Sequence, residues 1–198
     1  PDFLISGLIG MTVFFTATAV SPVIAPWEAQ IQTLERLISA PISITTLLFG
    51  DMLASFLFGM LIPILPIGIG LAIGVNIIHP IIFILGIILA AACFSSFGLI
   101  LSSPPSNAPS NVMMISSLVR FPLVFISGIF IPFEQMPYWG KIVASFSPLT
   151  YFTDLIRYTI NGTSYYPIQT DFIAIILFTV TFFFLAVQLH KRTIFKRI

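Results

Sequence analysis

Residues 80–101 form the stretch PIIFILGIILAAACFSSFGLIL, which contains no charged side chain. A helix needs about 20 mostly apolar residues to cross the hydrocarbon core of a bilayer, and this stretch is long enough. Four further stretches also qualify: residues 3–24, 46–74, 112–131 and 172–189. None of them alternates between apolar and polar residues as a transmembrane β-strand does. The sequence therefore predicts an all-α, polytopic transmembrane helix bundle with five spans, which form a single domain over residues 1–198.

The overall composition excludes several classes of protein. Hydrophobic residues make up 58% of the chain and charged residues only 8%, against about 25% charged residues in an average soluble domain. So few charges cannot cover the surface of a water-soluble enzyme. The net charge of +1 gives no sign of nucleic-acid binding. No cluster of His and Cys residues predicts a metal site.

Basic residues are concentrated at the C-terminus. The final stretch HKRTIFKRI contains half of the Lys and Arg residues of the chain, namely Lys191, Arg192, Lys196 and Arg197. Such clusters stay on the cytoplasmic side of a membrane. We therefore expect a multi-pass protein of the plasma membrane with a cytoplasmic C-terminus. Counting the spans backwards places residues 25–45 inside and residues 132–171 outside.

The same count places the N-terminus outside, and the chain begins with Pro1 rather than Met. Two interpretations follow from this. One is a cleaved or truncated product. The other, which we favour, is that one further N-terminal span precedes this chain.

Residues 25–45 are too polar to cross a membrane. Apolar side chains recur there at helical spacing, at Trp27, Ile31, Leu34 and Ile38. A polar stripe repeats that spacing one position further on, at Glu28, Gln32, Glu35 and Ser39. Pro26 suits a first helical turn and Pro41 ends the helix. The pattern predicts an amphipathic helix at about 26–40. By pattern alone, a helix that only buries its apolar side in the membrane surface explains these residues as well.

Residues 132–170 are rich in proline and aromatic residues, but contain no run long enough to span. Two short helices that dip into the outer leaflet fit this composition, because aromatic residues gather at the membrane interface. Asp154 and Arg157 are three positions apart and could pair on one helical face. This re-entrant segment is either a capping structure or a gate.

Two motifs show a family resemblance. The first is TLERLISAPIS at 33–43, and the second has two parts, FPLVFISGIFIPFEQMP at 121–137 and SPLTYFTDLIR at 147–157. In these the chain resembles the membrane subunit of type-2 ATP-binding-cassette (ABC) exporters, the permeases of drug and polysaccharide exporters. The resemblance implies that the first motif is a coupling helix that docks on an ATPase subunit, with contacts from Thr33, Leu34, Glu35, Arg36 and Pro41. The second motif corresponds to the end of the fifth span of the family and the broken outer segment after it.

The resemblance also implies a mechanism and a set of partners. The family usually has six spans, and this chain matches the second to the sixth. It would move a drug-like, lipid-linked or polymeric substrate outward. It would work as a homodimer, or as a heterodimer with a related permease, and the dimer would be in contact with membrane lipid. The chain has no Gly-rich phosphate loop with Lys, so it would not bind ATP by that route. The resemblance implies a transporter subunit that is no enzyme and binds no cofactor itself. ATP and Mg would be bound by the partner ATPase.

Arg120 lies in the middle of the fourth predicted span, where a charge is costly and usually functional. Three explanations of this residue are open. It contacts substrate or a lipid headgroup, or it forms a structural pair with an acid such as Asp51, or its side chain extends towards the inner membrane surface. Together with the residues of the second motif it forms our set of candidate pathway or gate residues, which is Arg120, Ser127, Gly128, Pro132, Glu134, Pro148, Tyr151, Asp154 and Arg157.

Two other functions compete with an ABC permease. A self-contained secondary transporter or channel would need coupling-ion ligands near the midplane or inverted repeats, and the sequence shows neither. A membrane enzyme acting on lipid would need paired carboxylates or a His/Asp set near one face, whereas the acids of this chain are scattered.

Overall fold

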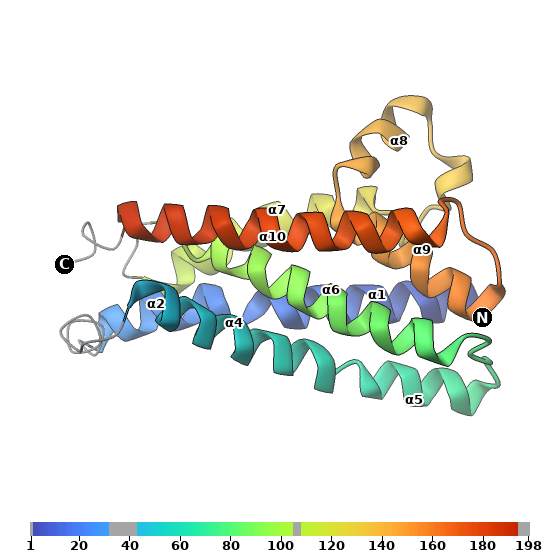
Figure 1. Cartoon of the computed structure of the whole chain (residues 1–198), viewed down its shortest axis with the longest axis horizontal. Coiled ribbons are helices and arrows are strands. Elements are labelled where there is room, and N and C mark those ends of the chain that lie inside the picture. The colour runs from blue at the N-terminus through green and yellow to red at the C-terminus, as the bar shows by residue number, and fades with distance from the viewer. Residues whose placement is uncertain (1, 32–42, 105–107, 194–198) are drawn as a thin grey trace.

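The computed structural model describes residues 2–31, 43–104 and 108–193. Within these ranges the chain consists of helices without any β-strand (Figure 1). The α-helices are α1 (Asp2–Ala19), α2 (Ser21–Gln30), α4 (Ile44–Leu61), α5 (Ile64–Ile73), α6 (Pro80–Leu101), α7 (Pro109–Ile126), α8 (Tyr138–Ser145), α9 (Pro148–Asn161) and α10 (Ile168–Thr193). A short 3-10 helix, η1, covers Phe133–Gln135. The predicted all-α fold is confirmed.

Five helical stretches are long and apolar enough to cross a membrane. They are Asp2–Glu28, Ile44–Ile73, Pro80–Leu101, Pro109–Ile126 and Ile168–Arg192. The first combines α1 with most of α2, and the second combines α4 with α5. The structure therefore has the predicted polytopic character, although two of its spans contain a break.

Proline residues explain both breaks. Pro22 lies just after the bend at Val20 and has no N–H, so the carbonyl of Thr18 four residues earlier cannot make its regular helical bond. Pro63 and Pro66 lie at the start of α5, and they too have no N–H to donate within the helix. The first span therefore continues beyond its predicted end, through the bend and into α2. Residues 26–30, which we predicted as the start of the amphipathic helix, belong to α2. Residues 32–42, which hold the rest of that helix, lie outside the described residues.

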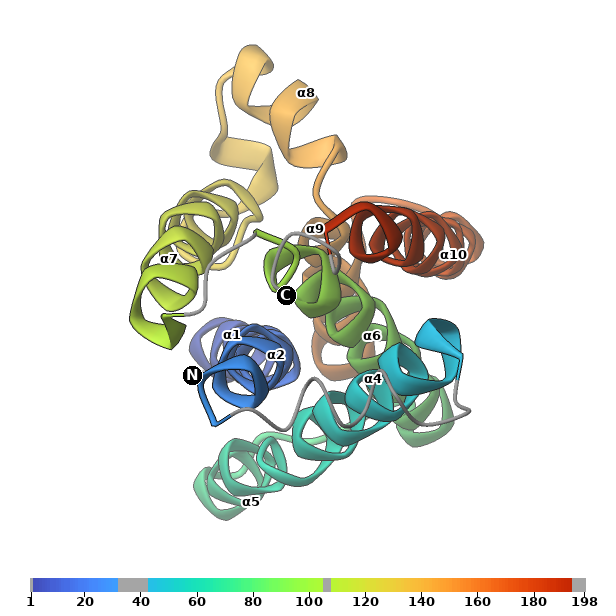
Figure 2. The same ribbon diagram turned by 90° about the vertical axis from the view of Figure 1, so that its left-hand side faces the viewer.

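The core of the bundle lies around α6, which is placed between α1, α4 and α10 (Figure 2). Its fully buried Ala90 and Ala91 allow neighbouring helices to approach closely. A series of edge-to-face aromatic contacts runs through this core, with ring centroids 5.1 Å apart for Phe14 and Phe94 and 5.7 Å apart for Phe94 and Phe152. These contacts join α1, α6 and α9, so α9 is anchored in the core.

At Gly59, α4 packs closely against Ala17 of α1, and we expect Gly59→Ala to destabilise the bundle. An added Cβ would lie 2.7 Å from the Cβ of Ala17, and overpacking of this kind costs about 1–3 kcal/mol. Gly50 on the same helix is the matched control, because an added Cβ there meets nothing within 4 Å. Gly50→Ala should stabilise α4 slightly. Thermal melting of the two purified variants tests this expectation, and equal melting temperatures would contradict it.

The two ends of the bundle differ. The N-terminus, α8 and α9 lie at one end, whereas α2 and the C-terminal end of α10 lie at the other (Figure 1). Trp27 on α2 is 54% exposed, and Trp139 on the projecting α8 is 69% exposed. The two short helices predicted within residues 132–170 are α8 and α9, and the 3-10 helix η1 precedes them. Of these, α9 is the one packed into the core.

The fourth span also ends earlier than its apolar sequence indicates. We predicted a span up to residue 131, but α7 ends at Ile126. The N–H of Ser127 caps the helix by donating to the carbonyl of Leu123, and Gly128 then has φ +83°. A positive φ favours glycine and turns the chain away from the helix axis.

Candidate functional site

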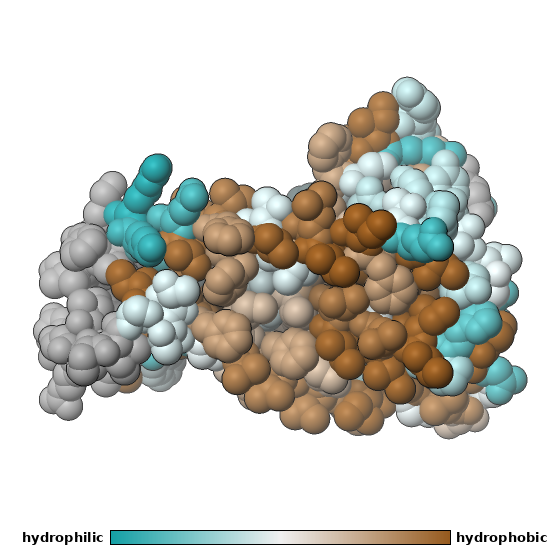
Figure 3. Space-filling model, in the orientation of Figure 1, coloured by the Kyte–Doolittle hydropathy of each residue, from teal (hydrophilic) through white to brown (hydrophobic). Residues whose placement is uncertain are grey.

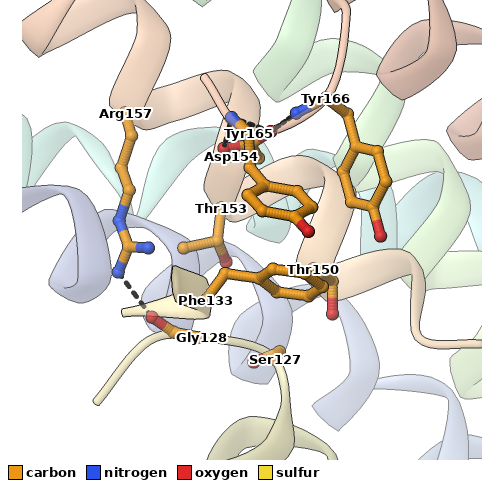
Figure 4. Close-up of a pocket in the computed structure, with 9 residues that line it drawn as sticks. All are labelled: Ser127, Gly128, Phe133, Thr150, Thr153, Asp154, Arg157, Tyr165 and Tyr166. Atoms are coloured by element: carbon orange, nitrogen blue, oxygen red, sulfur yellow. Dashed lines mark hydrogen bonds between the residues drawn. The ribbon is translucent and has the colours of Figure 1, made fainter. Parts of the chain in front are cut away.

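A cluster of polar and aromatic residues surrounds α9 at the end of the bundle where the N-terminus lies (Figures 1 and 4). Its members come from the turn after α7, from η1, from α9 and from the segment before α10. We call them the α9 cluster: Ser127, Gly128, Phe133, Thr150, Thr153, Asp154, Arg157, Tyr165 and Tyr166. They enclose a small pocket with room for about one water molecule.

Asp154 holds the segment before α10 against α9. Its side chain is 9% exposed. The backbone N–H of Tyr165 donates to both carboxylate oxygens at 3.0 Å, and the N–H of Tyr166 donates to Oδ2 at 2.8 Å. Hydrogen bonds to a charged acceptor are roughly twice as strong as neutral ones. Asp154 therefore fixes the position of both tyrosines (Figure 4).

Arg157 connects α9 to two other parts of the bundle. Its Nη2 donates to the carbonyl of Gly128 in the turn after α7. Its guanidinium carbon lies 4.3 Å from the centroid of the Phe3 ring at the start of α1, a distance typical of a cation–π contact. The positive φ of Gly128 allows its carbonyl to face α9.

A larger cavity of about 190 Å³ adjoins the small pocket. Phe133, Asp154, Arg157 and Tyr165 belong to both. The rest of its lining comes from the start of α1, from Pro132, from the end of α9 and from the turn after it, and consists of Phe3, Pro132, Asn161, Thr163 and Ser164. The wall thus offers an acid, a base, polar groups and aromatic rings to a molecule that enters from this end.

Asp171 is a further acid near this cluster, in the first turn of α10. Its side chain is 0% exposed, and no residue in the described part of the chain gives either carboxylate oxygen a hydrogen bond. Burial raises the pKa of Tyr151 on α9, and the charges of Tyr166 and Asp171 raise that pKa further. Asp171 is therefore within electrostatic reach of the aromatic residues beside the cluster.

Arg120 is not a member of the α9 cluster. It lies on α7, is 7% exposed, and its Nη2 donates to the carbonyl of Thr18 at 2.6 Å. That carbonyl is the one which Pro22 leaves without its helical donor. Arg120 thus connects α7 to the bend between α1 and α2 by a hydrogen bond from its side chain to a backbone carbonyl. None of our three sequence-based explanations included such a bond.

The structure brings together most of the residues that the second motif supplied. Ser127, Gly128, Asp154 and Arg157 line the small pocket, and Pro132 lines the larger cavity. The others of this group are adjacent. Pro148 is the first residue of α9, and Tyr151 packs against Tyr166 and donates to the carbonyl of Ser145 at 2.8 Å.

Some predicted residues are not described in the structure. Glu134 lies in η1, and its side chain is outside the described part. The predicted coupling residues Thr33, Leu34, Glu35, Arg36 and Pro41 also lie outside the described residues.

Sequence reasoning missed several members of the site, in particular Tyr165, Tyr166, Thr150, Thr153 and Asp171. A signal for the first two was present, because the pair Tyr165–Tyr166 precedes Pro167 just before an apolar run. Aromatic residues in that position are typical of a membrane interface. The two threonines carry no comparable signal, since they are common residues of an amphipathic helix.

Comparisons with known proteins place the chain in a family. The family model "ABC-2 type transporter" matches residues 2–161. The chain is 26% identical to the inner membrane transport permease YadH of Escherichia coli (strain K12) over 193 residues, which is 96% of this chain and 75% of that protein. It is 30% identical to Nodulation protein J of Rhizobium leguminosarum bv. trifolii over 112 residues, which is 56% of this chain and 42% of that protein. No solved structure matches it.

The family match extends over most of the chain, and its inner membrane relatives agree with the five apolar helices of the structure. Together they identify a multi-pass protein of the plasma membrane. The chain belongs to the ABC-2 type transporter family and is the membrane permease subunit of an ABC transporter.

Proposed function

We propose that the chain exports its substrate, with energy from ATP that is bound with Mg and hydrolysed by a separate ABC ATPase subunit. The observation that carries this proposal is the two-ended arrangement of the bundle. At one end, α2 leads towards the motif at residues 33–43. At the other end lies the cavity beside the α9 cluster. Helix α1 runs between the two ends (Figure 1).

The contacts of α2 support a role in transmitting force. Ser21 Oγ and Ser55 Oγ are 2.7 Å apart, which joins α2 to α4, and the bond from Arg120 joins the bend to α7. A displacement of residues 33–43 by the ATPase would therefore reach α4 and α7 through short polar bonds. Movement of packed helices against each other is one established way to alternate access to a site.

The cavity supports a substrate that has both polar and apolar parts. Asp154 and Arg157 offer opposite charges, and Phe3 and Phe133 offer aromatic walls. A drug-like or lipid-linked molecule, or the repeating unit of a polymer, would meet these requirements.

A second permease copy, either identical or related, would complete the pathway. Helix α7 exposes a wide apolar face that a single copy leaves uncovered: Met113, Met114, Leu118, Phe121 and Phe125 are between 47% and 68% exposed. In a bilayer, lipid covers such a face in a single copy, and a second copy that packs against it would take the place of this lipid. We place the C-terminus in the cytoplasm, together with residues 33–43.

Glu35→Arg tests the proposed coupling. We expect transport to fall roughly ten-fold or more, because reversing a charge at a docking surface costs about 2 kcal/mol or more. ATP hydrolysis by the partner should continue, so that the two activities become uncoupled. The measurement is transport and hydrolysis in vesicles that contain the permease and its ATPase. Gln135→Arg, which adds a charge on an exposed residue at the opposite end, is the control and should leave coupling intact.

Two results would count against the proposal. Wild-type transport by Glu35→Arg would exclude a coupling role for this residue. Transport by the permease alone, without ATPase or ATP, would instead support a self-contained secondary transporter or channel.

A further inference from the structure

An apolar groove lies on the face formed by α4, α6 and α10, which faces the viewer in Figures 1 and 3. It consists of two neighbouring hollows of about 230 and 180 Å³ that share Phe49 and Met52. The first is completed by α10, and the second by α4 and α6. We call these residues the α4–α10 groove: Phe49, Met52, Leu53, Phe56, Ala92, Thr179, Val180, Phe183 and Phe184.

The groove offers no polar group to an occupant. Thr179 is its one hydroxyl residue, and its Oγ1 donates to the carbonyl of Ile175 at 2.7 Å. The sulfur of Met52 accepts a hydrogen bond from Ser96 at 3.5 Å. The rings of Phe49 and Phe183 meet edge to face, with centroids 6.5 Å apart. An occupant of this groove must therefore be apolar.

Two basic residues follow the groove at the C-terminal end of α10. Lys191 and Arg192 are both exposed, and hydrophilic side chains appear beside the apolar surface at this end of α10 in Figure 3. Lys191 follows Phe184 by seven positions, so it lies on the same face of the helix, two turns or roughly 10 Å further on.

The start of α4 lies beside the basic end of α10. Ile44 and Val187 pack against the same buried cluster of Leu48, Leu99 and Ala186. Ser43 and Thr46 are exposed there, with their hydroxyl oxygens 2.7 Å apart. The acid of α4, Asp51, belongs to the opposite face of that helix and is within electrostatic reach of Glu28 on α2. The end of the groove is thus polar, with its charge supplied by two cations.

We propose that the α4–α10 groove binds one acyl chain of an anionic phospholipid, whose phosphate contacts Lys191 and Arg192. A span of 25 residues, Ile168–Arg192, is about 37 Å long, which brings its basic end to the headgroup level of a bilayer. Charge complementarity selects the headgroup, because each basic residue near the surface attracts an anionic lipid. The lipid would bridge α4 and α10 and is separate from the cavity beside the α9 cluster.

The test is lipid retention by the purified full chain in detergent, measured by native mass spectrometry with added phosphatidylglycerol or phosphatidylcholine. The wild-type chain should retain phosphatidylglycerol more tightly. Changing both Lys191→Gln and Arg192→Gln should reduce this preference by about five-fold per residue. Lys141→Gln, at the other end of the bundle, is the matched control and should leave the preference unchanged.

A second pair of variants tests the acyl-chain part of the site. Val180→Trp should fill the groove and reduce the retention of both lipids. Ile173→Trp introduces the same ring on the exposed face of α10, outside the groove, and should have no effect. Both positions are exposed, so the bundle should fold in either variant, and thermal melting checks that it does.

Three outcomes would overturn the proposal. The first is equal retention of the two lipids by the wild-type chain, which would indicate ordinary lipid contact only. The second is an unchanged preference after both basic residues are replaced. The third is a change of oligomeric state in Val180→Trp with lipid retention unaltered, which would assign the groove to a protein partner.

Discussion

Asp154→Asn should lower the melting temperature of the purified protein by several degrees, whereas Asp171→Asn should leave it unchanged or raise it. The two acids lie near each other and are both buried, but only Asp154 is known to accept backbone N–H groups, those of Tyr165 and Tyr166. An asparagine there would turn its NH₂ group towards one of these donors. Loss of a buried hydrogen bond to a charged group costs about 3 kcal/mol.

Asp171 differs because none of the described residues donates a hydrogen bond to its carboxyl group, and a buried carboxylate without a donor is unfavourable in itself. Asparagine has the same shape and cannot ionise, so the change removes a group whose charged form is unfavourable at this position. Thermal melting of both variants in detergent, beside the wild type, is the measurement. Equal destabilisation by the two changes would show that Asp171 has a favourable interaction comparable to that of Asp154, and would contradict this view of the site.

Arg120→Leu should destabilise the protein by about 2 kcal/mol, because it leaves the carbonyl of Thr18 buried without a donor. The same change should cost much less in a chain that carries Pro22→Ala. Alanine at position 22 supplies the backbone N–H that proline lacks, so the carbonyl of Thr18 regains its helical partner. The measurement is a double-mutant cycle on the thermal stability of the two single variants and the double variant.

The cycle separates this role from a direct contact with substrate. Additive effects of Arg120→Leu and Pro22→Ala would show that the arginine and the bend are independent. A variant Arg120→Leu of wild-type stability with reduced transport would point to a residue of the translocation pathway. Arg120→Lys serves as the control, since lysine keeps the charge and can donate one bond.

The spans could be predicted from the sequence because crossing a bilayer depends on length and hydropathy, which are local properties. One exception is the end of α7, where Ile129, Phe130 and Ile131 continue the apolar run beyond the turn at Gly128. Hydropathy cannot detect this turn, because the positive φ of Gly128 produces it while the residues around it stay apolar. The family resemblance supplied Asp154 and Arg157, but not the atoms that they contact.

Those contacts depend on tertiary structure. The donors to Asp154 lie in a segment after α9, and the acceptor of Arg120 is a backbone carbonyl 102 positions away in the sequence. Every residue has the same backbone carbonyl, so the identity of a residue does not indicate whether that carbonyl accepts a hydrogen bond from a side chain. The position of Pro22 four residues after Thr18 was nevertheless visible, so an unsatisfied carbonyl at that point could have been inferred, although its donor could not.

The exposed tryptophans at the two ends of the bundle give the protein a natural pair of optical probes. The chain has two Trp residues, Trp27 on α2 and Trp139 on α8, and both are more than half exposed. Replacing either one with Phe leaves a single tryptophan, whose emission reports on one end alone. Emission wavelength and quenching by iodide can therefore follow the two ends separately during a transport cycle, without any added label.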